Sequence, residues 1–460
     1  MATMSKGPML FNQAIRGGIA SSAGDTTLKI ISFLSTALVL SHIAPYQFGI
    51  WQLLLSILTA FSLPLFPSVG GMLIADASRE IGGGKNKIAN GILVKAGIVV
   101  SGMGAVLATL MFLAAPLVTE ITNFQMTELL RILSFALLFN GVAQLYPLIL
   151  RTRLEFFHVQ FNRAIGRISY LIALLLFVVV LELDIMGLAY AFLAASIVPV
   201  VAYFPYIARL YVSMARNMEG NWRIFFDAIF KRGIWVIATD CIKAIIGACM
   251  PWVIGLYLGV PVIGLITIAQ TLLSHVSSAV PVSFVLRSVL PRTVHDTERL
   301  RVWLTRSMKY SVWLHLVAGV LGLSAFAVLA PVFFPAYVAA IPLCAMLMPS
   351  IIFRGPGVVA SEWFYSSHNQ KDFFLWSTLP GFVAFLFLAP MLYLLGLPGY
   401  VLNTYLAADI LLVFRLWTIR RKTGIRISFR EFIRVDAQDA DVVRRVIELF
   451  LNRVRTVLSR

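Results

Sequence analysis

Four charged residues lie inside long apolar stretches of the sequence, where charge is costly. Asp25 and Lys29 are four residues apart in the first stretch, and Asp240 and Lys243 are three apart in the seventh. Residues at these spacings share one face of a helix. A charge at the centre of a bilayer costs about 2.5–3.5 kcal/mol on insertion scales, so such residues are usually functional. We interpret the two pairs as groups that face each other across a central cavity; the alternative is that each pair neutralises itself structurally.

A second set of cations lies at the ends of the even-numbered apolar stretches. These are Arg79, Arg151, Arg153, Arg287 and Arg354. Guanidinium groups suit the recognition of an anionic headgroup at a cytosolic entrance. The candidates for substrate binding are therefore Lys29, Lys243, Arg79, Arg287 and Arg354. The alternative for any one arginine is plain anchoring by positive charge on the inner side.

No pattern for covalent, metal or cofactor chemistry is present in the sequence. GGGK at 82–85 is followed by Asn86, whereas a phosphate-binding loop requires GxxxxGK[ST]. The six histidines show no metal-ligand spacing. We therefore expect neither an enzyme nor a resident metal or cofactor.

The elements that carry these residues are predicted to be membrane-spanning helices. Only 13% of the 460 residues are charged and 59% are hydrophobic, with a mean hydropathy of +0.87. Soluble domains have about 25% charged and 45–50% apolar residues, so a soluble enzyme is excluded. Apolar runs of about 20 residues predict an all-α polytopic membrane protein. Twelve spans are expected: 17–40, 47–74, 92–115, 129–150, 164–181, 187–207, 234–257, 262–286, 310–330, 338–353, 373–392 and 400–417. Pro342, Pro349 and Pro356 predict a bend in the region 338–366.

The charges of the connecting loops predict the orientation. One alternating set of loops, with the tail from 415, holds 34 of the 38 basic residues, and the opposite set holds none. Basic loops stay on the cytosolic side, which places both termini in the cytosol. This asymmetry accounts for most of the net charge of +17, so nucleic acid is not an expected partner. The short opposite loops leave no room for an extracytoplasmic catalytic domain.

A weak internal repeat divides the chain into two halves of six spans. Asp25 precedes Gly49 by 24 residues, and Asp240 precedes Gly264 by 24 residues, which gives an offset of 215. Halves with an even number of spans are parallel repeats, as in one class of secondary transporters. The expected parts are two pseudo-symmetric lobes around a cavity, a cytosolic interfacial linker and a basic amphipathic tail that meets anionic lipids. Their boundaries are 1–207, 208–233, 234–417 and 418–460, where the linker is 208–233 and the tail is 418–460.

The chain resembles the polysaccharide transporters, or O-antigen-type (Wzx-like) lipid-linked oligosaccharide flippases, of the multidrug/oligosaccharidyl-lipid/polysaccharide (MOP) exporter superfamily. The resemblance rests on HIAPYQFGIWQLLLSIL at 42–58, on DASREIGGGKNKIANGIL at 76–93, on the two halves and on the basic inner loops. It covers most of residues 1–417. Many members have 14 spans, and the sequence here predicts 12.

The resemblance implies alternating access and a polyprenyl-diphosphate-linked glycan that moves from the inner to the outer leaflet of a bacterial or archaeal cytoplasmic membrane. It also implies coupling to a sodium or proton gradient, with Asp25 or Asp240 as the coupling carboxylate. Polysaccharide polymerase and glycosyltransferases are expected partners, and we expect a monomer. Two other functions stay open: a drug/cation antiporter of the same superfamily, which prefers an acidic cavity without paired lysines, and a non-transporting scaffold for glycan assembly.

Overall fold

The computed structural model describes residues 27–62, 67–220, 222–227, 229–230, 234–279, 290, 296–367, 369–427 and 431. Every regular element in these ranges is a helix. Ten of the described helices are long and apolar enough to cross a membrane, and a shorter apolar helix spans Thr27–His42. Together with α2 and α3, these helices occupy all twelve predicted spans. The prediction of an all-α membrane protein with about twelve spans is confirmed.

The elements of the first half follow helix Thr27–His42. They are α2 (Pro45–Ser62), α3 (Pro67–Gly82), α4 (Asn86–Thr122), α5 (Thr127–Ala143), α6 (Leu145–Thr152), α7 (Phe156–Leu174) with the π-helix η2 (Leu175–Val180), and α8 (Asp184–Arg216). The short α9 (Trp222–Asp227) precedes the second half. The second half comprises α10 (Ile234–Leu258), α11 (Val260–Ala279), α13 (Thr297–Phe333), η4 (Pro335–Tyr337), α14 (Ala340–Leu347), η5 (Met348–Ser350), α15 (Ile351–Ser366), α16 (Gln370–Phe373), η6 (Phe374–Thr378), α17 (Leu379–Leu386), α18 (Leu388–Leu395) and α19 (Leu397–Thr423).

Several helices extend well beyond the apolar stretches that predicted them. α4 begins six residues before its predicted span and ends seven after it, and α13 begins thirteen residues early. Hydropathy marks only the part of a helix that crosses hydrocarbon, whereas backbone hydrogen bonding continues into polar turns. The proline-rich region 338–366 is bent as expected, by the 3₁₀ turn η5, but α15 continues through Pro356 to Ser366.

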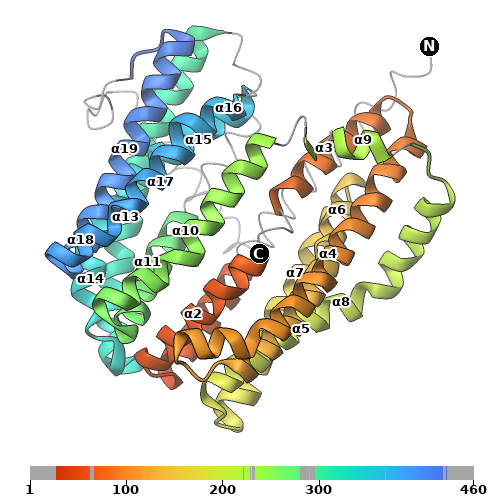
Figure 1. Ribbon diagram of the computed structural model, residues 1–460. Coiled ribbons are helices and arrows are strands. Elements are labelled where there is room, and N and C mark those ends of the chain that lie inside the picture. The colour runs from red at the N-terminus through yellow and green to blue at the C-terminus, as the bar shows by residue number, and fades with distance from the viewer. Residues whose placement is uncertain are drawn as a thin grey trace, which may run out of the picture.

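Three hydrophobic cores show how the two halves are joined. The largest combines residues of both halves, from Val39–Leu58 of the first to Tyr400 of the second. The second core comes from the first half and Ile237 at the start of α10, and the third from the second half alone. The halves therefore share one core at one end and have separate cores at the other. Figure 1 shows the two groups of helices side by side, with α2 between them at the lower end.

Two glycines allow the helices of the two halves to touch at the shared end. A Cβ added to Gly49 of α2 would lie 2.2 Å from the carbonyl oxygen of Val260 in α11. A Cβ added to Gly264 of α11 would lie 2.6 Å from the carbonyl oxygen of Pro45 in α2. Both partners are related by the 215-residue offset predicted from the sequence. The contact is reciprocal, as at a two-fold axis, where residue i meets j and j meets i.

Two hydrogen bonds reinforce the same end. Tyr337 Oη donates to the carbonyl oxygen of Ile43 at 2.7 Å, and Trp252 Nε1 donates to Ser56 Oγ at 2.8 Å. Both join the second half to the first. The end of the molecule that they close carries the loops without lysine or arginine, 41–46, 258–261 and 331–337.

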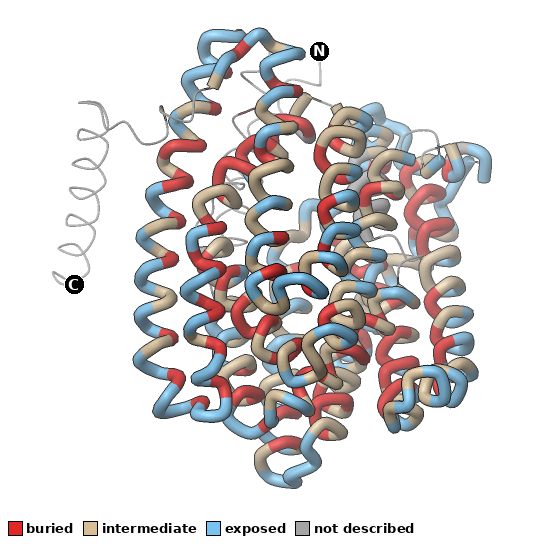
Figure 2. The backbone as a smooth tube through the Cα atoms, turned by 60° about the vertical axis from the view of Figure 1, so that its left-hand side comes forward, coloured by how far each residue is buried: buried red, intermediate tan, exposed pale blue. Residues whose placement is uncertain are grey.

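The outer faces of the helices suit lipid. Buried and exposed residues alternate along the helices in Figure 2, and large apolar side chains dominate many exposed positions, such as Leu256 at 79% and Val328 at 71%. In water such a surface would be an aggregation site, but in hydrocarbon it is the expected solvent contact.

The segment between the halves is attached to the first half. The buried Lys95 of α4 donates to the carbonyl oxygen of Gly220 and lies 5.6 Å from the ring centre of Trp222. In α9, Trp222 is exposed while Phe225 is buried, which matches an element lying at an interface. The predicted amphipathic helix within the tail 418–460 lies outside the described residues.

Candidate functional site

Arg354 lies in a polar cavity within the second half rather than at a loop. The cavity has a volume of about 650 Å³ and is lined by residues of α10, α11, η5, α15 and α19. Its polar lining consists of Gln270, Ser274, Ser277, Ser350, Arg354, Tyr400, Asn403, Thr404 and Arg415. No aspartate or glutamate is among the described residues that line it. The cavity is therefore suited to anions.

A short hydrogen-bond chain orients Arg354. Its Nη2 donates to Gln270 Oε1 at 2.8 Å, and Gln270 Nε2 donates to Tyr400 Oη at 2.9 Å. The three residues come from α15, α11 and α19, so the chain ties three helices together around the cavity. A buried polar network of this kind fixes the direction of its members.

Arg415 is a second cation of this cavity, and the sequence did not single it out. Its Nε donates to Ser377 Oγ at 2.9 Å, and its Nη1 donates to the carbonyl oxygen of Gly357 at 2.8 Å. One available signal was its position: Arg415 lies between apolar residues of α19, five residues before the basic run that begins at Arg420.

Lys243 and Asp240 lie close to this site but do not form a direct ion pair within 4 Å. Lys243 Nζ is 5.5 Å from the ring centre of Phe373, and the guanidinium carbon of Arg415 is 5.6 Å from the same ring. Asp240 Oδ2 is buried without a hydrogen-bond partner. The pair therefore does not neutralise itself by direct contact.

The other predicted site residues are placed differently. Lys29 Nζ donates to the carbonyl oxygen of Ser278 in α11 at 2.5 Å, which links the two halves. The exposed Arg79 lies 4.0 Å from Asp76 and lines none of the cavities described here. Asp25 and Arg287 lie outside the described residues. That the two lysines face each other across a cavity stays a prediction.

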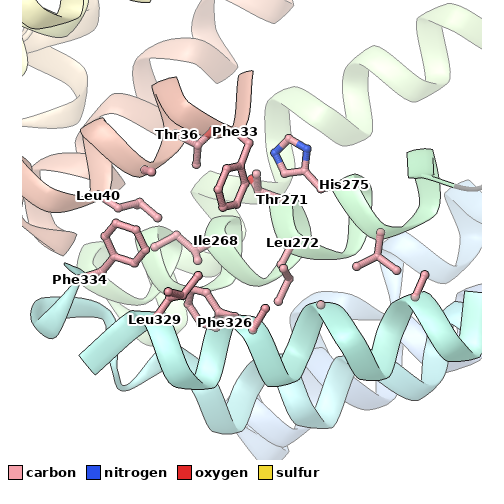
Figure 3. A pocket seen from close by; sticks show the side chains of 15 residues that line it. Phe33, Thr36, Leu40, Ile268, Thr271, Leu272, His275, Phe326, Leu329 and Phe334 are labelled. Atoms are coloured by element: carbon pink, nitrogen blue, oxygen red, sulfur yellow. The ribbon is translucent and has the colours of Figure 1, made fainter. Parts of the chain in front are cut away.

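An apolar cavity of about 300 Å³ lies between helix Thr27–His42, α11 and α13. Figure 3 shows side chains from these helices around it, with Phe33 beside His275. The two rings meet edge to face with centres 6.3 Å apart. Its labelled lining is Phe33, Thr36, Leu40, Ile268, Thr271, Leu272, His275, Phe326, Leu329 and Phe334. Apart from Thr36, Thr271 and His275, this labelled lining is hydrocarbon or aromatic, which suits a lipid chain.

Helix α11 separates the apolar cavity from the polar one. Gln270, Ser274 and Ser277 line the polar cavity, whereas Ile268, Leu272 and Val276 line the apolar cavity. A third cavity of about 280 Å³ shares Gln270, Ser274 and Tyr400 with the former and Thr271 with the latter. The arrangement places a cationic and an apolar compartment side by side.

Comparison with known proteins agrees with this architecture. Residues 97–316 match a family described as "Polysaccharide biosynthesis protein". None of the curated proteins compared with this chain matches it. In the described residues, no group of three or more histidine, cysteine, aspartate or glutamate residues is placed to hold a metal ion.

Solved structures share the fold at low sequence identity. An inward-facing multidrug resistance MATE family transporter of the MOP superfamily has a TM-score of 0.74 and 16% identity, covering 88% of this chain and 98% of that one. An outward-facing MATE transporter has a TM-score of 0.66 and 17% identity, covering 90% and 96%. A MOP superfamily transporter from Pyrococcus furiosus has a TM-score of 0.64 and 16% identity, covering 90% and 95%. The resemblance predicted from the sequence is therefore confirmed: this chain is a multi-pass membrane protein of the MOP superfamily, with the fold of its transporters and a match to the polysaccharide biosynthesis family over residues 97–316.

Proposed function

We propose that this chain moves a polyprenyl-diphosphate-linked oligosaccharide from the inner to the outer leaflet of the cytoplasmic membrane. One observation carries the proposal: α11 has a cationic, acid-free cavity on one face and an apolar cavity on another. Such a substrate has the same division, since its diphosphate and sugars are polar and its polyprenyl chain is hydrocarbon. The match to a polysaccharide biosynthesis family supports this substrate class.

A protein path is needed because the diphosphate cannot cross hydrocarbon unaided. Arginine and lysine side chains replace water around the phosphates, and serine, asparagine and glutamine side chains suit hydroxyl-rich sugars. The polyprenyl chain remains in an apolar environment throughout, so only the headgroup must be carried. The division of work between the two faces of α11 fits this requirement.

The proposed direction follows from which end is closed. The halves share a core at the end whose loops lack basic residues, while the basic loops lie at the end with separate cores. If the basic loops are cytosolic, this is an inward-facing arrangement that accepts substrate from the inner leaflet. The higher TM-score to the inward-facing transporter than to the outward-facing one agrees with it.

The drug/cation antiporter is less well supported because a cationic substrate requires carboxylates. The described lining of the polar cavity contains Arg354 and Arg415 and no acidic residue. In the cycle we propose, a sodium or proton gradient drives the return step, and Asp240, whose Oδ2 has no hydrogen-bond partner, is the described candidate for the coupling group.

The proposal is tested in a strain that lacks the native copy. We expect loss of surface glycan and accumulation of the lipid-linked intermediate on the inner leaflet, both reversed by the wild-type chain. Drug susceptibility is the matched control and should not change. Normal surface glycan in the deletion strain would contradict the proposal, and altered drug susceptibility with normal glycan would favour the antiporter.

The orientation gives a prediction of its own. Single cysteines at Glu120 and Glu182 should react with a membrane-impermeant thiol reagent in intact cells, whereas cysteines at Lys85 and Arg299 should react only after lysis. The native cysteines are first replaced, because Cys249 is exposed. Labelling at Lys85 from outside would reverse the orientation and the proposed direction of transport.

A further inference from the structure

Arg354 and Arg415 reach the same cavity from two helices. Arg415, from α19, donates to the carbonyl oxygen of Gly357, which is three residues beyond Arg354 on α15. Residues three apart on a helix are neighbours on its surface. The guanidinium of Arg415 is therefore held beside the turn of α15 that carries Arg354, and both residues line the polar cavity.

The charge of this cavity is not balanced by its own lining. Two cations share a compartment of about 650 Å³ with no carboxylate among its described lining residues. Like charges repel more strongly in a low-dielectric interior than in water, and each carries a desolvation cost. An anion that enters the cavity relieves both.

Several hydrogen-bond donors at this site lack partners. In the described part of the chain, Arg354 donates only one hydrogen bond, to Gln270, although a guanidinium has five N–H groups. The buried hydroxyls of Ser277 and Ser350, which also line the cavity, have no hydrogen-bond partner. Ser350 is 0% exposed. Buried donors without partners are uncommon and point to a ligand with several acceptor oxygens.

We infer that Arg354 and Arg415 form a clamp for the diphosphate of a lipid headgroup, assisted by the hydroxyls of Ser277 and Ser350. The identity of the lipid rests on the proposed function; the anion site rests on the cavity itself. Guanidinium groups bind phosphate oxygens through two parallel N–H donors, which a lysine cannot do. The clamp therefore differs from the sequence-based expectation that Lys29 and Lys243 hold the phosphates.

The test measures binding to the purified full-length chain in detergent by calorimetry. The probes are farnesyl diphosphate, farnesol and inorganic pyrophosphate. Farnesyl diphosphate should bind, and Arg354→Gln and Arg415→Gln should each weaken it about ten- to a hundredfold, as expected for charge-assisted contacts. Arg354→Lys should fall between wild type and Arg354→Gln. Arg301→Gln, which removes an exposed arginine of α13, is the matched control and should bind as wild type does.

Two results would overturn the clamp. One is unchanged binding of farnesyl diphosphate in Arg354→Gln, a variant that retains the contacts of Arg415 with Ser377 and Gly357. The other is binding of pyrophosphate as tightly as farnesyl diphosphate, which would assign the site to a free anion rather than to a lipid. If Arg415→Gln fails to fold by circular dichroism, the two variants of Arg354 decide the test.

Glycan export separates this inference from the proposed function. Weakened binding in Arg354→Gln with normal surface glycan would leave the clamp in place and contradict the flippase. Intact binding with lost glycan would contradict the clamp and leave the flippase in place. Loss of both supports both.

Discussion

Replacing Gly49 or Gly264 with alanine is expected to open the end of the molecule at which the two halves meet. The new Cβ would lie 2.2 Å from Val260 O in the first variant and 2.6 Å from Pro45 O in the second. Both obstacles are backbone atoms at the first residue of a helix, so they cannot rotate away as a side chain can. Overpacking of this kind costs about 1–3 kcal/mol. That cost should shift the population roughly tenfold to a hundredfold toward a state with the ends apart.

Spin labels at Glu120 of α4 and Tyr393 of α18 would report the change as a longer distance between the two halves at that end. Gly102 and Gly247 provide matched controls, because both lie in helices and a Cβ at either would meet nothing within 4 Å. Alanine at these two positions should leave the distance distribution unchanged. Since the two contacts are reciprocal, the two test variants should behave alike.

An unchanged distance in both test variants would show that the close approach of α2 and α11 does not hold this end shut. A change in Gly49→Ala alone would contradict the pseudo-two-fold relation. Export should fall in either variant if the cycle requires the inward-facing state to accept substrate.

Much of the fold was predictable because lipid imposes strong rules on sequence. A bilayer requires about 20 apolar residues per helix and sorts basic loops to one side, so the spans are visible in hydropathy and charge. The internal repeat was visible in Gly49 and Gly264, which share an offset of 215 with their partners. What the sequence did not show is why those glycines matter, since the close approach of two helices is a property of packing.

The candidate site was less predictable for a related reason. Hydropathy identifies that a charged residue lies in or near a span but not which direction it faces. Arg354 was expected at a cytosolic mouth, and it lines an internal cavity. Arg415 was counted with the basic tail because α19 continues into Arg420 and Arg421. The hydroxyl of Ser350 carries no sequence signal, because serine is common in membrane helices.

The matched positions of Lys29 and Lys243 in the repeat suggested one shared role, but their contacts differ. Lys29 reaches Ser278 near the end of α11, where carbonyl groups without helical partners attract a cation. Lys243 lies over Phe373 beside Arg415. Equivalent positions therefore have unequal surroundings, which is expected once two repeats evolve separate tasks around one cavity.

Replacing Lys243 with methionine should reduce export of the lipid-linked glycan about ten- to a hundredfold while the protein level in the membrane stays normal. Methionine keeps the apolar stem and removes the charge, so the loss reports a charge-assisted contact or a change in the field at Arg415. Surface glycan and membrane protein level are measured together in the strain that lacks the native copy. Lys85→Met, at an exposed turn before α4, is the control and should export normally.

A purely structural role for Lys243 makes a different forecast. If it only balances Asp240, Lys243→Met leaves a buried carboxylate uncompensated and lowers the protein level, and adding Asp240→Asn restores both level and export. We expect no such rescue, because the two side chains form no direct ion pair and Asp240 Oδ2 already lacks a hydrogen-bond partner. Full export by the double variant would remove Lys243 from the substrate path and leave phosphate recognition to the arginines of the polar cavity.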